Sequence, residues 1–216
     1  ITSRLAATRL PNKPLLKINN ISIINHVYLK AISSKIGDVF VATGDKEIFE
    51  EVRKIDGKCV LTEKEHQTGT DRIFEAYQKL GIKDVDYIIN LQGDEPMIDI
   101  EDIKNLNNSA IKNKSEIATL ACKIKDKKIF NKSNVVKVIT DEKISMEKMS
   151  RANIFSRVVS SNDNSNIYHH IGIYIYKVSI LEKFVNLKQS KNEIDQKLEQ
   201  LRAIDNNIEI NVILAN

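Results

Sequence analysis

The chain has 216 residues, of which 42% are apolar and 29% are charged, the composition of an ordinary globular protein rather than a disordered or fibrous one. Its formal net charge is +4, and its basic residues are spread along the chain without a dense run, which argues against a nucleic-acid interface. No apolar stretch reaches the length of a membrane span. We therefore expect neither a nucleic-acid partner nor membrane insertion.

Short apolar, β-branched segments alternate with helical patterns, a rhythm that favours crossover units and a mostly parallel sheet in one α/β domain covering residues 1–216. Strands are predicted at 38–43, 58–62, 88–91, 117–124, 135–139, 168–176 and 208–214, and helices at 23–32, 46–54, 73–80, 101–112 and 192–204. Because the chain opens on Ile1 and closes in an apolar run before Asn216, we expect both ends to be incomplete.

The first fifteen residues (ITSRLAATRLPNKPL) are a loop with small side chains and three cations, Arg4, Arg9 and Lys13. Arginine clamps phosphate oxygens through paired hydrogen bonds and lysine acts as a point charge, so the loop suits a triphosphate. Its spacing matches neither a Walker loop nor GxGxxG. From the residues alone, a solvated basic segment is the simpler interpretation.

Residues 65–72 (EHQTGTDR) form a polar loop that leads into the predicted helix 73–80, with Thr70 or Asp71 as its N-cap. The N-terminus of a helix suits contacts to a base or a phosphate. Ordinary capping explains the same residues without a ligand.

The central segment 87–96 (YIINLQGDEP) is a buried strand that stops at a glycine, which lets the backbone approach a ligand, followed by two carboxylates and a proline. Ligands of open α/β sheets bind beyond the carboxyl ends of the strands, where Asp94 would stand. One or two carboxylates with substrate phosphate oxygens are what Mg²⁺ favours. A solvated acidic turn explains the segment equally well.

Residues 168–176 (YHHIGIYIY) alternate as a strand does, with His170 and Tyr174 on a polar aromatic face and mainly apolar residues opposite. Since His169 points away from His170, the two cannot share one metal ion, and zinc is not expected. In the predicted helix 192–204, Glu199 and Gln200 lie off the apolar stripe and face either a ligand or solvent. Cys59 and Cys122 have no metal-site spacing, and we interpret them as buried thiols in a reducing compartment.

With these segments in view, the chain resembles the cytidylyltransferases that make CMP-Kdo from CTP and 3-deoxy-manno-octulosonate (Kdo). The matching motifs occur in family order over nearly the whole chain: TRLPNKPL (8–15), VAT (41–43), HQTGTDR (66–72), NLQGDEPMI (90–98), FSR (155–157), HIGIYIY (170–176) and LEQLRAID (198–205). The resemblance implies a single, Rossmann-like nucleotidyltransferase domain with a protruding dimerisation segment, in a cytoplasmic homodimer.

The resemblance also implies a reaction, in which the anomeric hydroxyl of Kdo attacks the α-phosphorus of CTP and releases pyrophosphate, supplying CMP-Kdo for lipopolysaccharide synthesis. It assigns catalytic roles to Asp94, Arg4 and Lys13, and Mg²⁺ binding to Asp94, with a second metal ligand beyond Asn216. The nucleotide-binding residues would be Arg4, Arg9, Lys13, Thr70 and Arg72. The sugar-binding residues would be Gln92, Arg157, His170, Tyr174, Glu199 and Gln200, with Arg157 as the partner of the sugar carboxylate.

The chain departs from the family pattern at three positions of the nucleotide side. Ala7 stands where the family has serine, Asn12 where it has glycine, and Gly44 where it has an aspartate after VAT, so Asn12 must take a backbone conformation that glycine normally supplies. Two alternatives stay open: a CMP-sugar synthetase for another acidic sugar, such as sialic acid, and a nucleotide-binding homologue with weak or no turnover. A nucleic-acid-binding module is a remote third.

Overall fold

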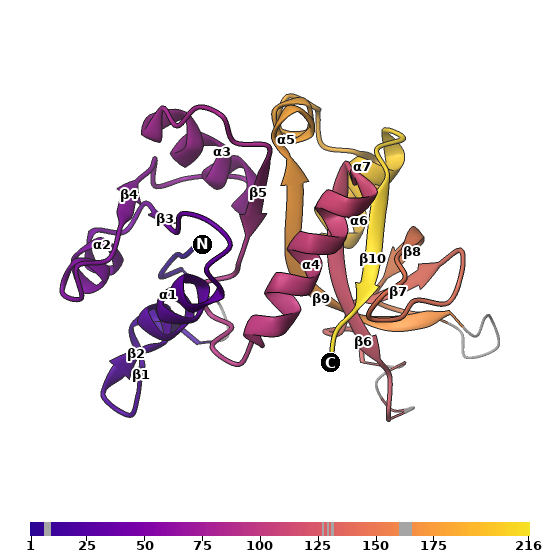
Figure 1. Cartoon of the computed structure of the whole chain (residues 1–216), viewed down its shortest axis with the longest axis horizontal. Coiled ribbons are helices and arrows are strands. Elements are labelled where there is room, and N and C mark those ends of the chain that lie inside the picture. Colours follow the sequence, from indigo (N-terminus) through magenta and orange to yellow (C-terminus); the bar gives the residue numbers. More distant parts are fainter. Residues whose placement is uncertain (7–9, 127, 129, 131, 160–165) are drawn as a thin grey trace. The chain divides into compact units, whose positions relative to one another are not determined.

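Residues 1–6, 10–126, 128, 130, 132–159 and 166–216 are described by the computed structural model of the chain. They form two compact units, Ile1–Lys104 (unit 1) and Asn105–Asn216 (unit 2) (Figure 1). Both units contain helices and strands, which confirms the predicted α/β class. That one domain covers residues 1–216 stays a prediction.

Unit 1 follows the strand–helix alternation that the sequence predicts. Strand β3 pairs in parallel with β4, Val41 lying opposite Cys59, because α2 returns the chain to the starting end of the sheet. The elements are η1 (Lys13–Leu15), β1 (Lys17–Ile18), β2 (Ile21–Ser22), α1 (Ile23–Ser34), β3 (Val41–Thr43), α2 (Lys46–Arg53), β4 (Cys59–Leu61), α3 (Gly69–Leu80) and β5 (Tyr87–Asn90), and α4 (Ile100–Asn113) begins here.

The first three residues of the chain connect two strand ends of unit 1. Thr2 forms parallel bridges to Ala42 in β3 and to Gln92 just after β5. The Thr2 amide donates to the Leu91 carbonyl (2.9 Å) and the Ser3 amide to that of Ala42 (3.1 Å). All three residues are buried. The interpretation of residues 1–15 as a solvated segment is therefore wrong for residues 1–3.

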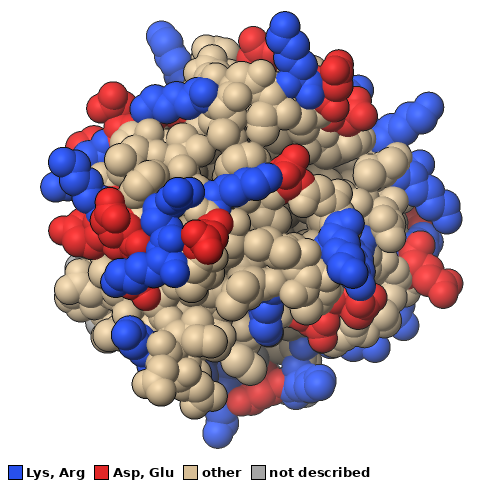
Figure 2. All heavy atoms as spheres, turned by 60° about the vertical axis from the view of Figure 1, so that its left-hand side comes forward, with Lys and Arg blue, Asp and Glu red and all other residues tan. Residues whose placement is uncertain are grey.

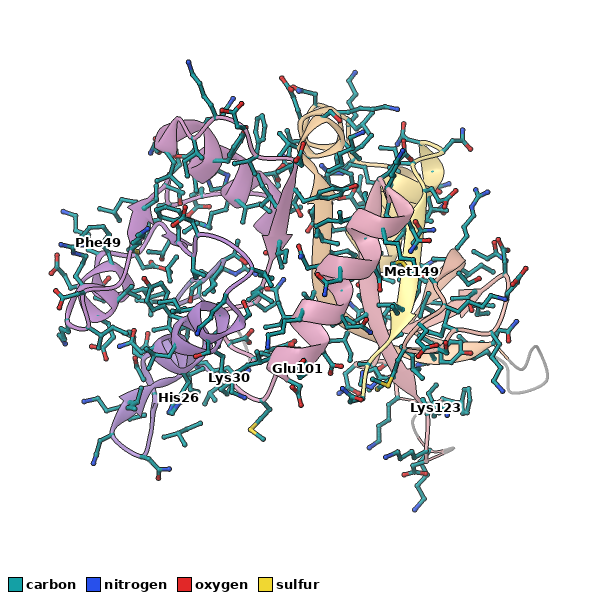
Figure 3. All side chains as sticks on the ribbon, viewed as in Figure 1. His26, Lys30, Phe49, Glu101, Lys123 and Met149 are labelled. Carbon is teal, nitrogen blue, oxygen red and sulfur yellow. The ribbon has the colours of Figure 1, made fainter. Side chains whose placement is uncertain are left out.

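A short hairpin, β1 and β2, precedes α1 and is fastened to it. His26 on α1 donates from Nε2 to the Ile18 carbonyl of the hairpin (2.9 Å). One turn further along α1, Lys30 donates to the carbonyl of Ile98 (2.9 Å); Figure 3 shows both side chains. The first contact fixes α1 to the hairpin, and the second fixes it beside the segment that follows the QGDEP turn.

Unit 2 is built on a mixed sheet that closes on itself, in the order β9–β6–β10–β8–β7 with β7 pairing back to β9. Among these pairings only β6–β10 is parallel, so the prediction of a mostly parallel sheet is wrong for unit 2. The connections 141–149 and 157–166 are shorter than the crossover of about a dozen residues that parallel neighbours need. The elements, after α4, are β6 (Ile117–Lys123), β7 (Lys137–Thr140), β8 (Ser150–Ser156), β9 (Ile167–Lys177), α5 (Val178–Val185), α6 (Lys191–Gln196), α7 (Leu201–Asp205) and β10 (Ile210–Leu214).

The helix predicted over 192–204 is two helices, α6 and α7, because the chain turns at Lys197, which has φ 53° and ψ 49°. The turn folds α7 back, so that the Arg202 guanidinium meets the Glu193 carboxylate in two hydrogen bonds of 2.6 and 2.9 Å. Both side chains are buried. A buried ion pair of this geometry fixes the orientation of α7, and with it the position of Gln200 at its start.

The surface carries charges of both signs. Figure 2 shows a face on which Lys and Arg side chains are interspersed with Asp and Glu. Exposed pairs such as Lys58–Asp38 (2.8 Å) contribute little to stability, because water and salt screen them. None of the helices within the described ranges has the length and apolar character to cross a membrane.

Candidate functional site

Three chain segments of unit 1 end at one edge of its parallel sheet: the N-terminal segment after Thr2, β3, and the segment after β5. Parallel pairing places the residues that follow them side by side. The Leu5 amide accordingly donates to the Asp45 carboxylate at 2.8 Å. This edge carries Arg4, which is exposed, and Asp94. Arg9 and Ala7 lie outside the described residues, so their roles stay predictions.

Asp94 and Lys13 form an ion pair at this edge, with Nζ 2.9 Å from Oδ2. Their side chains are 46% and 34% exposed, which leaves the pair open to a ligand from solvent. Lys13 reaches Asp94 because Asn12, directly before η1, adopts a left-handed conformation with φ 57° and ψ 19°. This confirms the expectation that Asn12 takes the conformation glycine normally supplies, which asparagine tolerates better than most residues.

Gly93 permits a close approach, although to the chain itself rather than to a ligand. A Cβ there would lie 2.9 Å from the Ser3 Cβ and from the Thr2 carbonyl oxygen, and 2.8 Å from Ile24 Cδ1. The Gly93 amide donates to the same Thr2 carbonyl at 2.8 Å. The glycine therefore fixes the N-terminal segment beside the turn that carries Asp94.

Glu95 is a site residue that the sequence reasoning did not single out, although it stands next to Asp94. Burial raises the pKa of the Glu95 carboxyl, the charge of Asp94 raises it further, and Lys13 opposes both. Two neighbouring carboxyl groups face one ammonium, an arrangement that favours a further cation. Within the described ranges, no three His, Cys, Asp or Glu residues are grouped to hold a metal ion.

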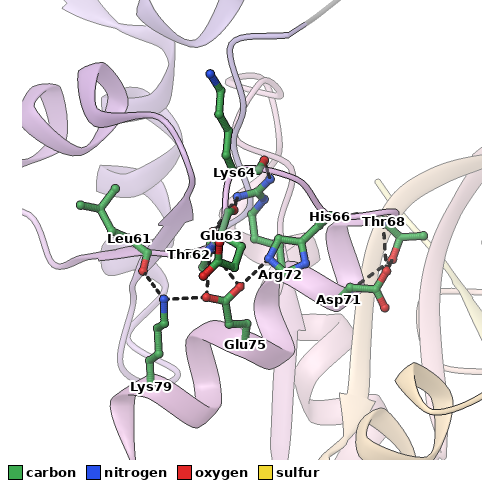
Figure 4. A network of polar contacts seen from close by, with 10 residues as sticks. All are labelled: Leu61, Thr62, Glu63, Lys64, His66, Thr68, Asp71, Arg72, Glu75 and Lys79. Atoms are coloured by element: carbon green, nitrogen blue, oxygen red, sulfur yellow. Dashed lines mark hydrogen bonds and ion pairs between the residues drawn. The ribbon is translucent and has the colours of Figure 1, made fainter.

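Arg72 is buried at the start of α3 and holds the preceding loop (Figure 4). Its Nη1 donates to Thr62 Oγ1 (2.6 Å) and to the Glu63 carbonyl (2.9 Å), and its Nη2 donates to the Lys64 carbonyl (3.0 Å). Burial lowers the pKa of Arg72, and the charges of Asp45 and Glu75 oppose this. The guanidinium thus acts on the backbone of residues 62–64.

The loop that Arg72 holds, residues 62–64, explains why residue 44 is a glycine. A Cβ at Gly44 would lie 2.6 Å from the Lys64 Cα and 2.7 Å from the Glu63 carbonyl oxygen. The aspartate expected here would therefore displace the loop that Arg72 holds. Asp45, one residue later, supplies the carboxylate that accepts from Leu5.

Glu75 on α3 fastens the other side of the loop (Figure 4). Its carboxylate pairs with Lys79 (2.6 Å) and His66 (2.5 Å) and accepts from the Glu63 amide (3.0 and 3.1 Å). Burial raises the pKa of Glu75, but these hydrogen bonds outweigh it and leave the pKa below its usual value.

The N-cap of α3 is Thr68, in a reciprocal capping box with Asp71. The prediction of Thr70 or Asp71 as the N-cap is wrong, because the helix begins four residues earlier than expected. Thr70 instead lies in the first turn, where it is buried. Loop and helix start form a rigid pair, and this rigidity suits the recognition of a flat base.

The predicted aromatic face of β9 lies in unit 2 and is intact. The rings of Phe155, His170, Tyr174 and Tyr176 follow one another at centroid distances of 5.1, 5.3 and 5.9 Å. A bulge interrupts β9, but it inserts two residues, so that His170 and Tyr174 stay on the same side. The alternation predicted for 168–176 therefore holds for these rings.

Thr119 on β6, which the sequence reasoning missed, orients His170. The Thr119 hydroxyl donates to the Ile173 carbonyl (2.6 Å), and its oxygen lies 3.0 Å from His170 Nε2. Burial lowers the pKa of His170 to about 3, and the charge of His169 contributes. The imidazole is thus neutral, with its proton on Nε2 pointing to Thr119 and Nδ1 left as an acceptor.

Tyr174 presents a buried hydroxyl that has no hydrogen-bond partner among the described residues. Burial raises its pKa well above the usual value, and the charges of Tyr176 and Glu199 add to this. Gln200 is also buried, at the start of α7. Because buried polar groups are nearly always paired, the Tyr174 hydroxyl indicates a place for a polar ligand.

Arg157 follows β8 and donates to three backbone carbonyls at 3.2 Å each, those of Ser133, Gln196 and Lys197. It thereby lies against the turn between α6 and α7, directly before Glu199. Five of the six predicted sugar-binding residues belong to unit 2, whereas Gln92 belongs to unit 1 beside Thr2.

Comparisons with known proteins give a consistent family. The family model described as "Cytidylyltransferase" matches residues 1–210. The 3-deoxy-manno-octulosonate cytidylyltransferase of Thermodesulfovibrio yellowstonii is 42% identical over 98% of this chain and 87% of its own length. That of Rhodopseudomonas palustris is 41% identical, over 98% and 86%. A solved structure of CMP:2-keto-3-deoxy-manno-octonic acid synthetase complexed with CTP superimposes with a TM-score of 0.88 at 33% identity, covering 99% of this chain and 87% of its own.

Proposed function

The chain belongs to the cytidylyltransferase family, with 3-deoxy-manno-octulosonate cytidylyltransferases among its relatives, and from this premise we propose that it makes CMP-Kdo. CMP passes from CTP to the anomeric hydroxyl of Kdo, and pyrophosphate leaves. The observation that carries the proposal is the identity of 42% over nearly the whole chain with a relative that bears this name. The site geometry supports it, because cations line one edge of unit 1 and polar buried groups line β9.

On the nucleotide side, Lys13, Arg4 and Arg9 neutralise the triphosphate and the pyrophosphate that leaves. The exposure of the Lys13–Asp94 pair supports this role, since a phosphate can reach Nζ without unfolding the loop. Thr70 lies in the helix turn beside the proposed base-recognition loop 62–68. We assign Arg72 to the same function through the loop it holds, because its guanidinium is occupied by Thr62 and two carbonyls.

Asp94 is the residue that would hold Mg²⁺. The geometry of the turn supports this, because the carboxylate of Asp94 is half-exposed beside Lys13 and the partly buried carboxyl of Glu95 follows it directly. A bound Mg²⁺ would supply charge neutralisation for the phosphates and orientation for the sugar hydroxyl. The residues of the chain itself bring the phosphates to Lys13 and the acid sugar to β9.

On the sugar side, the donors and acceptors of unit 2 suit a polyhydroxy acid. Neutral His170 offers Nδ1 as an acceptor, and the Tyr174 hydroxyl offers the hydrogen bond that it lacks within the described residues. Arg157 has five N–H groups and uses three on carbonyls of the described residues, which leaves two of its donors for the sugar carboxylate. Glu199 and Gln200 bind sugar hydroxyls from the start of α7, and Gln92 does so from unit 1.

We test the function by pyrophosphate release with Mg²⁺, pairing CTP, UTP and ATP each with Kdo and with sialic acid. Release only from CTP with Kdo is expected, and chelation by EDTA is expected to stop it. Release with sialic acid instead would favour the related CMP-sugar synthetase. No release from a folded protein would favour the homologue without turnover. Ala7 and Gly44 are the departures that motivate this alternative, and the structural need for glycine at position 44 removes the second of them.

The family resemblance alone supports three further parts of the proposal: a homodimer formed through a protruding segment, a cytoplasmic location, and a role in lipopolysaccharide synthesis. Sedimentation of the purified protein measures the first. A monomer at micromolar concentration with full activity would contradict it.

A further inference from the structure

We propose that Lys137, a buried lysine of β7, is a positioning residue that holds Arg157 and the α6–α7 turn in place for the acid sugar. This inference rests on the proposed function. It concerns a residue that touches neither the proposed nucleotide residues nor the aromatic face of β9.

Lys137 is one of the most deeply buried charged residues of the molecule, with no exposed surface. Its ammonium donates to the carbonyls of Lys132 (3.0 Å), Val135 (2.8 Å) and Arg157. Among the described residues no carboxylate pairs with it. Burying a charge whose only partners are carbonyl dipoles is energetically unfavourable, and a methionine would pack at this position without that penalty. The presence of a lysine here therefore indicates a role other than packing.

The three N–H groups of Lys137 and three of Arg157 together bind six backbone carbonyls from three separate segments. The segments are 132–135, the residue after β8, and the turn at 196–197. Lys137 acts on Arg157 twice, through the carbonyl of Arg157 itself and through the segment whose Ser133 carbonyl accepts from its Nη1. Removal of the ammonium therefore releases the backbone of Arg157 and one anchor of its guanidinium.

This network of two cations and six carbonyls, which we call the clamp, also reaches the predicted sugar residues just before α7. Arg157 Nε and Nη2 donate to the carbonyls of Gln196 and Lys197, a short step along the chain from Glu199 and Gln200. The left-handed Lys197 ends α6 here, so these two carbonyls fix where the next helix starts. Lys137 thereby sets the positions of an arginine and of a helix start that bind the same proposed ligand.

The electrostatics explain why the ligand should be an acid. Two cations lie within one carbonyl cage, and within the described ranges neither has an acidic partner. Burial lowers the pKa of Lys137, and the positive charge of Arg157 lowers it further, so the two repel each other. A carboxylate at Arg157 relieves that repulsion, whereas a neutral sugar does not.

Lys137→Met keeps the length and packing of the side chain but removes its charge and donors. We expect the KM for Kdo to rise by about tenfold or more, the equivalent of losing one well-placed hydrogen bond, while the KM for CTP changes less than about twofold. Lys137→Arg, which keeps a charge and donors, should restore part of the Kdo affinity. An unchanged KM for Kdo in Lys137→Met would overturn the proposal.

The matched control is Val52→Ala in α2. Val52 is as fully buried as Lys137 but belongs to unit 1, which contains none of the six carbonyls or the two cations. This variant loses stability through a cavity without touching the clamp or the aromatic face, so its KM for Kdo should stay at the wild-type value. If Val52→Ala raises the KM for Kdo as much as Lys137→Met does, the effect is one of general stability and the proposal fails.

A second measurement keeps this proposal separate from the proposed function. The side-chain Nε–H of Arg157, assigned by ¹⁵N NMR with an Arg157→Lys reference, should exchange slowly in the wild type because Gln196 holds it. In Lys137→Met the signal should broaden or exchange faster. If wild-type protein gives no turnover with Kdo, the proposed function fails, and this signal alone decides the positioning role: an unchanged signal would overturn it.

Discussion

His170 shows how burial of a single residue determines its chemistry. The ring packs between Phe155 and Tyr174, and the residue pattern around it indicates only an alternating strand. Burial holds the pKa near 3, far below the usual value of 6.5. The residue therefore offers a fixed acceptor to a ligand across the pH range in which enzymes of this kind work, rather than acting as an acid or a base.

Acidification should destabilise the fold through His170. The unfolded chain takes up a proton near pH 6.5 while the folded chain does so only near pH 3, so stability is lost as pH falls below 6.5. Between pH 6.5 and 5 the free energy of unfolding should fall by about 2 kcal/mol through this residue. Urea unfolding at pH 7 and pH 5 should show this loss in the wild type and a smaller loss in His170→Phe. Equal losses in both would contradict the assignment.

Asp94→Asn should abolish pyrophosphate release and leave the fold nearly unchanged. The Lys13–Asp94 pair is solvent-exposed, so its loss costs less than about 1 kcal/mol of stability, whereas the proposed metal ligand is lost entirely. Turnover and thermal melting, measured on the same preparation, separate the two effects. Lys58→Met, which removes the exposed pair with Asp38, is the control and should retain activity. Full activity in Asp94→Asn would remove Asp94 from the site.

At the scale of elements, α3 and the loop before it act as one unit through Arg72 and Glu75. A lysine in Arg72→Lys cannot reproduce the three hydrogen bonds of the guanidinium. We expect this variant to lower the free energy of unfolding by roughly 2–4 kcal/mol. The KM for CTP should rise while the KM for Kdo stays within about twofold. Lys79→Met removes an exposed partner of Glu75 and of the Leu61 carbonyl but leaves the three hydrogen bonds of Arg72 in place, and it serves as the control. A selective rise in the KM for Kdo would place Arg72 with the sugar instead.

The elements that the sequence predicted are those whose apolar pattern decides their structure, such as β3, α2 and β9. Those it missed depend on contacts between distant residues. The helix over 192–204 breaks because Glu193 pairs with Arg202, a gain that periodicity does not register. The sequence does not predict strand β8, because one of its faces carries Arg151 and Asn153, both exposed, and its apolar stretch is short.

The residues of the candidate site likewise include some that the sequence predicts and some that it does not. Lys13, Asp94 and His170 follow as site residues from motifs and alternation, although the ion pair between Lys13 and Asp94 does not. Thr119 does not, because a threonine in an apolar strand gives no sign that it will bridge a bulge. Lys137 is hidden for the opposite reason: a lysine at a strand start is usually solvated, and only the folded chain brings three carbonyls to it.

At the scale of the whole molecule, the residues proposed to bind the nucleotide and those proposed to bind the sugar fall mostly in different units. The nucleotide and metal residues Arg4, Arg9, Lys13, Thr70, Arg72 and Asp94 all belong to unit 1, and the sugar residues other than Gln92 to unit 2. The strand pairing differs as well, since β3 and β4 of unit 1 pair in parallel whereas the pairings among the strands of unit 2 are mixed. Each substrate should therefore order its own part of the chain.

Hydrogen exchange measured by mass spectrometry tests this division. CTP with Mg²⁺ should slow exchange at residues 1–15 and 62–70, where it orders the basic loop and the loop held by Arg72. Kdo, added with a non-hydrolysable CTP analogue, should further slow exchange at 168–176 and 196–201, because it satisfies the Tyr174 hydroxyl and binds beside the turn at Lys197. Asp94→Asn should lose the first effect and keep the ability to fold. Protection by Kdo confined to residues 1–104 would contradict the assignment of the sugar to β9 and α7, even if CTP behaves as expected.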